Sequence, residues 1–119
     1  MIVEREFRAA QARVAAMPVP ERSDAVWRGM QRLAEADASG VLIVAYFALC
    51  ARLQIEGVAR ANVVDIAAAV GRPPDQLCDL LVELVERRAV LVRDVDELGI
   101  VVAVPVFDGD RASPSTALH

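Results

Sequence analysis

The first part of the chain carries apolar residues at helical spacing. Apolar side chains three or four residues apart over residues 3–16 predict an amphipathic helix, which Pro18 and Pro20 end. A second amphipathic helix is expected to begin with Ser23 as its N-cap and to run to about Ala36. The apolar stripe of the first helix consists of Val3, Phe7, Ala10 and Val14.

The next segment, from Val41 to Ile55, is apolar on nearly every side until Arg52. A helix that is apolar all round is normally buried all round, so we expect this one at the centre of the fold or across a subunit interface. Trp27, in the preceding helix, is expected to be a core or interface anchor. Because a small monomer has limited interior for so much aliphatic surface, the sequence predicts a homodimer joined mainly by residues 1–55.

The second half of the chain follows the order helix, tight turn, helix, strand, turn and strand. Asn62 is the expected N-cap of a short helix, and Gly71 is the expected left-handed residue that ends it. A longer helix should follow from Pro74 to Arg88, with a buried stripe of Leu77, Leu81 and Leu84.

Two β-strands are predicted after this longer helix. They cover Val90–Arg93 and Ile100–Phe107, and the second strand is rich in β-branched residues. Pro105 indicates an edge strand, because proline cannot donate to a ladder. The predicted fold is therefore mainly α with a small β-hairpin. We expect N-terminal helices in residues 1–61, a helix-turn-helix with its hairpin in residues 62–107, and a flexible tail in residues 108–119.

The run VVDIAAAVGRPPDQLCDLLVELVERRAVLVRD resembles the winged helix-turn-helix superfamily. The resemblance lies in a small alanine inside the first helix, an apolar residue and Gly71 at the turn, and a second helix that ends in LVERRAV. Regulators of the ArsR and MarR types are one comparison, which implies a dimer that places the second helix in the major groove of DNA. The segments IAAAVGRPPDQ and IVVAVPVF are also similar to the non-catalytic N-terminal domain of alkylmercury lyases. That second resemblance implies a fold and no activity.

Five residues are candidates for DNA contact under the regulator interpretation. Phosphate contacts need cations around the recognition helix, and base contacts need a donor or acceptor at its start. The candidates are Arg72, Gln76, Arg87, Arg88 and Arg93.

The charge of the chain favours a different interpretation. The net charge is −4, and residues 62–107 contain eight acids against the four arginines just named. Because carboxylates repel phosphates, this acidic surface is also typical of a winged helix that binds a protein. Both alternatives therefore remain open: a DNA-binding homodimeric regulator, and an acidic protein-interaction module, an adaptor or antagonist that does not bind DNA.

Candidate catalytic and cofactor chemistry is scarce in this sequence. His119 is the last residue, and no phosphate-binding glycine loop is present. Cys50 and Cys78 lie in apolar stretches, so both are expected to be buried thiols of a reducing compartment. Asp94, Asp96 and Glu97 alternate on a turn without a second set of ligands, so we expect no metal. The sequence predicts a cytoplasmic protein without a signal peptide, membrane span, enzymatic activity or cofactor.

Overall fold

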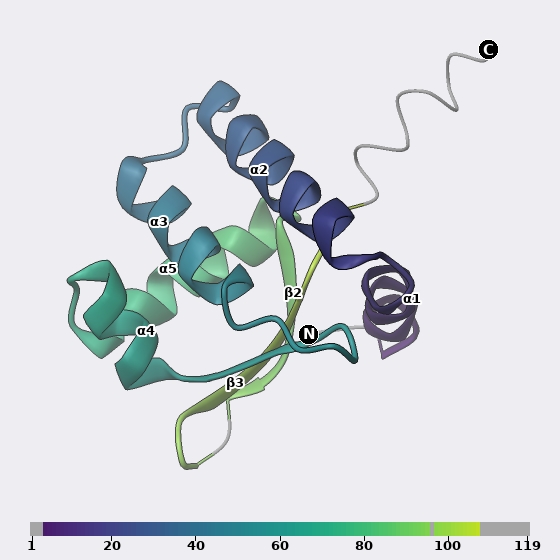
Figure 1. The fold of residues 1–119 in the computed structure, drawn as a ribbon. Helices are drawn as coiled ribbons and strands as arrows, with labels where there is room; N and C mark the ends of the chain where they lie inside the picture. Colours follow the sequence, from purple (N-terminus) through teal and green to yellow (C-terminus); the bar gives the residue numbers. More distant parts are fainter. Residues whose placement is uncertain (1–3, 96, 108–119) are drawn as a thin grey trace.

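The computed structural model describes residues 4–95 and 97–107. This part of the chain forms five helices and a small antiparallel sheet (Figure 1), so the predicted mainly α class with a small β component is confirmed. In chain order the elements are α1 (Glu4–Ala15), α2 (Val19–Glu35), α3 (Gly40–Cys50), β1 (Ala59–Asn62), α4 (Val63–Val70), α5 (Pro74–Glu86), β2 (Val90–Val95) and β3 (Ile100–Pro105).

The segment from α4 to α5 forms as its local signals predict. The Asn62 side chain accepts a hydrogen bond from the Val64 backbone N–H at 2.8 Å and so caps α4. Gly71 ends α4 with a φ of 79°, a conformation that a side chain would strain. Pro74 lies in the first turn of α5, where a missing N–H has no consequence. The predicted stripe of Leu77, Leu81 and Leu84 is buried.

Two helix boundaries differ from the prediction. The predicted N-cap at Ser23 is wrong, because α2 begins at Val19 with Pro18 as its N-cap and Pro20 in its first turn. The helix predicted to reach Ile55 ends at Cys50, where a turn leads into the strand β1. Proline is tolerated in a first helical turn, which explains why Pro20 did not delay α2.

The sheet has three strands in the order β1-β3-β2, and all pairs are antiparallel. The strand β1 was not predicted from the sequence; it pairs residue by residue with β3, from Ala59 opposite Ala103 to Asn62 opposite Ile100. Since β3 lies between the other two strands, the prediction of an edge strand from Pro105 is wrong. Pro105 is the final residue of β3, opposite Val90, so its missing N–H falls where the ladder ends.

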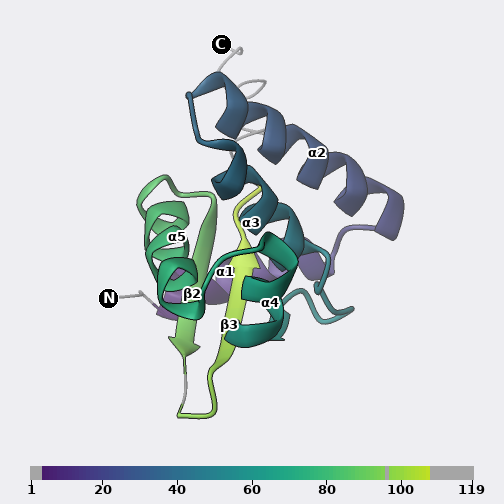
Figure 2. The same cartoon turned by 90° about the vertical axis from the view of Figure 1, so that its left-hand side faces the viewer.

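Helices cover both faces of this sheet (Figures 1 and 2). Val101 and Ala103 of β3 belong to the larger core, which α2, α3, α4 and α5 complete. Val104 belongs to a second core with α1, whose Phe7 is fully buried. The described part of the α1 stripe therefore packs inside its own chain, so it does not contribute to the dimer surface that was expected from residues 1–55; Val3 lies outside the described residues.

The helices α2 and α3 are in close contact at Gly29. A methyl group at this position would overlap the Tyr46 hydroxyl, and the Tyr46 Cζ would lie 2.8 Å from it. Gly29 is buried in the middle of α2, where glycine normally weakens a helix. Its lack of a side chain is what allows Tyr46 to lie fully inside the core.

Candidate nucleic-acid interface

The first turn of α5 and the turn before it form an exposed surface. All residues from Gly71 to Gln76 are exposed, whereas the next residue, Leu77, is fully buried, with 0% of its surface exposed. The Arg72 side chain makes no hydrogen bond or ion pair with any other described residue. The Gln76 side chain lies four residues further along the same surface. Arg72 and Gln76 are therefore both exposed at the start of α5.

The remainder of the exposed α5 surface is acidic and apolar. Asp75, Asp79 and Glu86 are exposed, and the Asp75 Oδ1 accepts a hydrogen bond from the Gln76 backbone N–H at 3.1 Å. Val82 lies among them with 56% of its surface exposed. A phosphate backbone laid along α5 would therefore meet several carboxylates beyond Arg72.

Arg87 and Arg88 lie at the opposite end of α5, roughly 20 Å from Arg72 by the rise of the helix. The Arg87 Nε donates to Glu83 Oε2 at 3.0 Å, and its Nη1 donates to the carbonyl of Ala36 at 3.3 Å. Ala36 follows the last residue of α2, so Arg87 is turned toward α2. Arg88 has a left-handed φ of 60°, which costs a residue with a Cβ about 1–2 kcal/mol.

Arg93, the candidate at the root of the hairpin, is held by α1. Its guanidinium carbon lies 4.3 Å from the centroid of the Phe7 ring, and its Nη2 donates to Glu4 Oε2 at 2.9 Å. The side chain is 33% exposed. A cation above an aromatic face and beside a carboxylate stabilises the packing of α1 on β2. No sequence signal linked Arg93 to residues almost ninety positions earlier.

The turn between β2 and β3 is the candidate wing. Leu98 is 79% exposed and Glu97 is exposed, while Gly99 has a φ of 79° that suits a tight turn. Asp96 and the side chain of Asp94 lie outside the described residues, and so does His119. Over the part of the chain that is described, no group of three His, Cys, Asp or Glu residues is placed to hold a metal ion.

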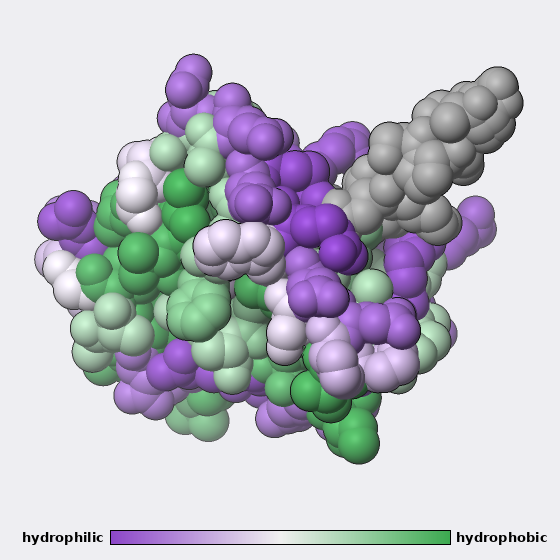
Figure 3. Space-filling view, turned by 45° about the horizontal axis from the view of Figure 1, so that its top comes forward, coloured by the Kyte–Doolittle hydropathy of each residue, from purple (hydrophilic) through white to green (hydrophobic). Residues whose placement is uncertain are grey.

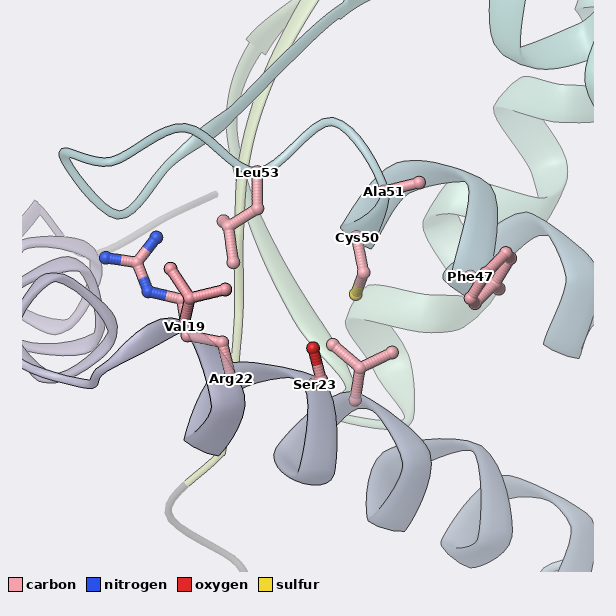
Figure 4. A pocket seen from close by; sticks show the side chains of 8 residues that line it. Val19, Arg22, Ser23, Phe47, Cys50, Ala51 and Leu53 are labelled. Carbon is pink, nitrogen blue, oxygen red and sulfur yellow. The ribbon is translucent and has the colours of Figure 1, made fainter.

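A second surface feature is an apolar groove of about 280 Å³ between the start of α2 and the end of α3. Figure 4 shows Val19 and Ser23 of α2 directed toward Cys50 and Leu53 on the opposite side. At one end of the groove Arg22 binds three backbone carbonyls, those of Met17, Gln54 and Ile55, which fixes the loop after α3.

The two cysteines differ in environment. Cys50 is buried, and burial raises the pKa of its thiol to about 12, with a hydrogen bond to the Tyr46 side chain opposing part of the rise. Cys78 is exposed on α5, so the prediction that both thiols are buried is wrong. Cys78 lies in an apolar stretch, but its helical phase turns it away from the Leu77 stripe.

Comparison with known proteins gives no match, either to a family model, to a curated protein or to a solved structure. No helix in residues 4–95 or 97–107 combines the length and apolar character that crossing a membrane requires.

Proposed function

We propose that the chain is a winged-helix protein and that it acts as a homodimeric, DNA-binding transcriptional regulator. The order α3–β1–α4–α5–β2–β3, together with the sheet order β1-β3-β2, supports the winged-helix assignment. In such proteins the second helix of the helix-turn-helix lies in the major groove. Here that helix is α5.

The observation that carries the DNA proposal is the exposed start of α5. Recognition helices contact base edges with their N-terminal residues, and this end of α5 offers Arg72 and the amide of Gln76 to solvent. Arg72 is available for a phosphate, because it has no ion pair among the described residues. The functional surface is therefore smaller than the sequence predicted, since Arg87 and Arg93 are bound to other parts of the chain.

The proposed dimer surface is the face formed by α2 and α3. Figure 3 shows hydrophobic residues forming a continuous area next to the hydrophilic outer face of α2. Four large apolar side chains on these helices remain about half exposed or more: Val19, Trp27, Val44 and Phe47. Aromatic side chains that become buried at an interface contribute most of its binding energy. A two-fold dimer would bury this face against its own copy and seal the groove beside Phe47.

Phe47→Glu tests the dimer without opening the core, because half of the Phe47 surface is exposed. A buried carboxylate facing its own copy should convert the dimer to a monomer in light scattering. Val82→Glu is the matched control, since Val82 is similarly exposed but lies on α5. A wild-type chain that is monomeric at micromolar concentration would refute the dimer.

A second function is favoured by the charge of α5. The exposed residues Asp75, Asp79 and Glu86 surround an exposed Val82, and this combination suits a basic and apolar protein partner better than a phosphate backbone. Under this alternative the chain is an acidic protein-interaction module, and the aspartates are contact residues.

A salt titration of DNA binding separates the two functions. Duplex DNA from around its own gene should bind at low salt, and Arg72→Ala should weaken binding and lower the slope of log affinity against log salt by about one unit. Arg8→Ala is the matched control, because Arg8 is an exposed arginine on α1. Replacing Asp75 and Asp79 with Asn should tighten nonspecific binding, because two repulsions are removed. If neither the native protein nor the Asn variant binds DNA at low salt, the regulator proposal fails and the interaction module stands.

A further inference from the structure

The strand β2 bends at Arg93, just before the turn that forms the candidate wing. Val92 lies opposite Ala103, and Asp94 lies opposite Val102. Because Ala103 and Val102 are adjacent in β3, Arg93 has no residue opposite it and is the extra residue of a β-bulge. A bulge bends its strand and redirects the side chain of the extra residue. The direction of the hairpin beyond this point therefore depends on how Arg93 is held.

The first turn of α1 holds the side chain of Arg93. Its guanidinium carbon lies 4.3 Å from the centroid of the Phe7 ring, and its Nη2 donates a hydrogen bond to Glu4 Oε2 at 2.9 Å. Phe7 is fully buried and belongs to the core that α1 shares with β3. The bulge of β2 is therefore attached to the helix that covers this face of the sheet (Figures 1 and 2).

The attachment is weak in three respects. The Glu4 and Arg93 side chains are 49% and 33% exposed, and ion pairs in contact with water stabilise a fold little. The same Glu4 oxygen also accepts a hydrogen bond from the Arg8 Nε at 3.0 Å, so Glu4 keeps a partner when Arg93 leaves. The Arg93 Nε is buried without a hydrogen-bond partner in the described part of the chain, a cost that release to water would remove. These terms favour release and oppose the contact with the Phe7 ring.

The other strand of the hairpin is joined to the start of α4. Gly99 follows the hairpin turn, and its carbonyl accepts a hydrogen bond from the Val63 backbone N–H at 2.8 Å. Asn62, the N-cap of α4, lies opposite Ile100 of β3. Figures 1 and 2 show α1 and α4 on opposite sides of the sheet, so the hairpin connects helices that cover different faces. A change in hairpin direction at the bulge would therefore reach the first helix of the helix-turn-helix.

We propose that Arg93 is a latch through which α1 sets the direction of the β2–β3 hairpin and, through Gly99, the start of α4. In the latched state Arg93 lies on Phe7 and binds Glu4. In the released state Glu4 keeps its pair with Arg8, Arg93 is hydrated, and the hairpin beyond the bulge takes a second direction. A partner that binds Arg93 only when it is released shifts the population toward that state. The inference goes beyond the proposed function and does not depend on whether α5 binds DNA.

Amide ¹⁵N–¹H NMR of the full chain tests for the two states. Glu4→Gln removes the ion pair, and Arg93→Met removes the charge while keeping an apolar stem over Phe7, so both variants favour release. The amide peaks of Leu98 and Gly99 should therefore move along one line, further in Arg93→Met than in Glu4→Gln, because the variants change the populations of the same two states. Slow exchange would instead give a second peak that grows in the same order.

Arg8→Ala is the decisive variant, because it should act in the opposite sense. Without Arg8, a released Glu4 has no partner, so the latched state is favoured and the same peaks should move the other way along the line. Arg5→Ala is the matched control, since Arg5 is an exposed arginine beside Glu4, and it should leave the peaks in place. Glu4→Gln keeps the test available if Arg93→Met does not fold, because Glu4 lies at the surface.

Two results would overturn the proposal. One is a set of hairpin peaks that stay in place in Glu4→Gln and Arg93→Met, which would mean that α1 only packs on the sheet. The other is an Arg8→Ala protein whose peaks stay in place or move in the same direction as in Glu4→Gln.

Discussion

Gly29→Ala is the substitution for which the structure and the intrinsic helix propensity predict opposite signs. Alanine in the middle of an exposed helix is about 1 kcal/mol more favourable than glycine. At Gly29 the new methyl group would overlap the Tyr46 hydroxyl and lie 2.8 Å from Tyr46 Cζ, and overpacking of this kind costs about 1–3 kcal/mol. The contact involves the Tyr46 ring, which is only 1% exposed and packs in the core. We therefore expect a net loss of about 1–2 kcal/mol.

Urea unfolding of three further proteins tests this reasoning. Gly40→Ala is the control, because Gly40 starts α3 and a methyl there meets nothing within 4 Å; it should be neutral or slightly stabilising. Tyr46→Phe removes the atom closest to the new methyl, so in that background Gly29→Ala should cost less, with a coupling energy of about 1 kcal/mol. If Gly29→Ala stabilises the protein as Gly40→Ala does, α2 and α3 do not meet at Tyr46.

Further predictions concern stability and thiol chemistry. Leu81→Ala should lower the free energy of unfolding by about 2–5 kcal/mol because Leu81 is buried, and Asp75→Ala by less than about 1 kcal/mol; the opposite ranking would refute the helical phase of α5. Arg88→Gly should raise the melting temperature, because glycine adopts the left-handed conformation of this residue without strain. The free energy of unfolding should rise by about 0.5 kcal/mol after the greater freedom of glycine in the unfolded chain is subtracted. A lower melting temperature would contradict the left-handed backbone. A thiol reagent at pH 8 should modify Cys78 and spare Cys50 in the native protein, and mass spectrometry of the labelled peptides would show any exception. Because folding raises the pKa of the Cys50 thiol from 9.0 to about 12, its contribution to stability is complete below pH 9 and should decrease as the pH rises toward 12, which Cys50→Ala should abolish.

The sequence alone determined the elements that depend on local signals. The N-cap at Asn62, the left-handed Gly71 and the leucine stripe of α5 each act within a few residues, so α4, the turn and α5 were predictable. The exposure of Arg72 and Gln76 was also predictable, since both fall off that stripe.

The tertiary structure alone decided which surfaces remain free. The strand β1 has the sequence ARAN, which carries no β-branched residue, and it forms because β3 offers a partner edge. Arg93 donates a hydrogen bond to Glu4 of α1, and Arg87 donates one to the carbonyl of Ala36 at the end of α2. No sequence pattern indicates either contact. An isolated glycine in a helix pattern was the one available signal for the approach at Gly29, and it did not name Tyr46 as the neighbour. Local pattern fixes backbone conformation within a few residues, whereas the pairing of distant side chains depends on how the complete core packs.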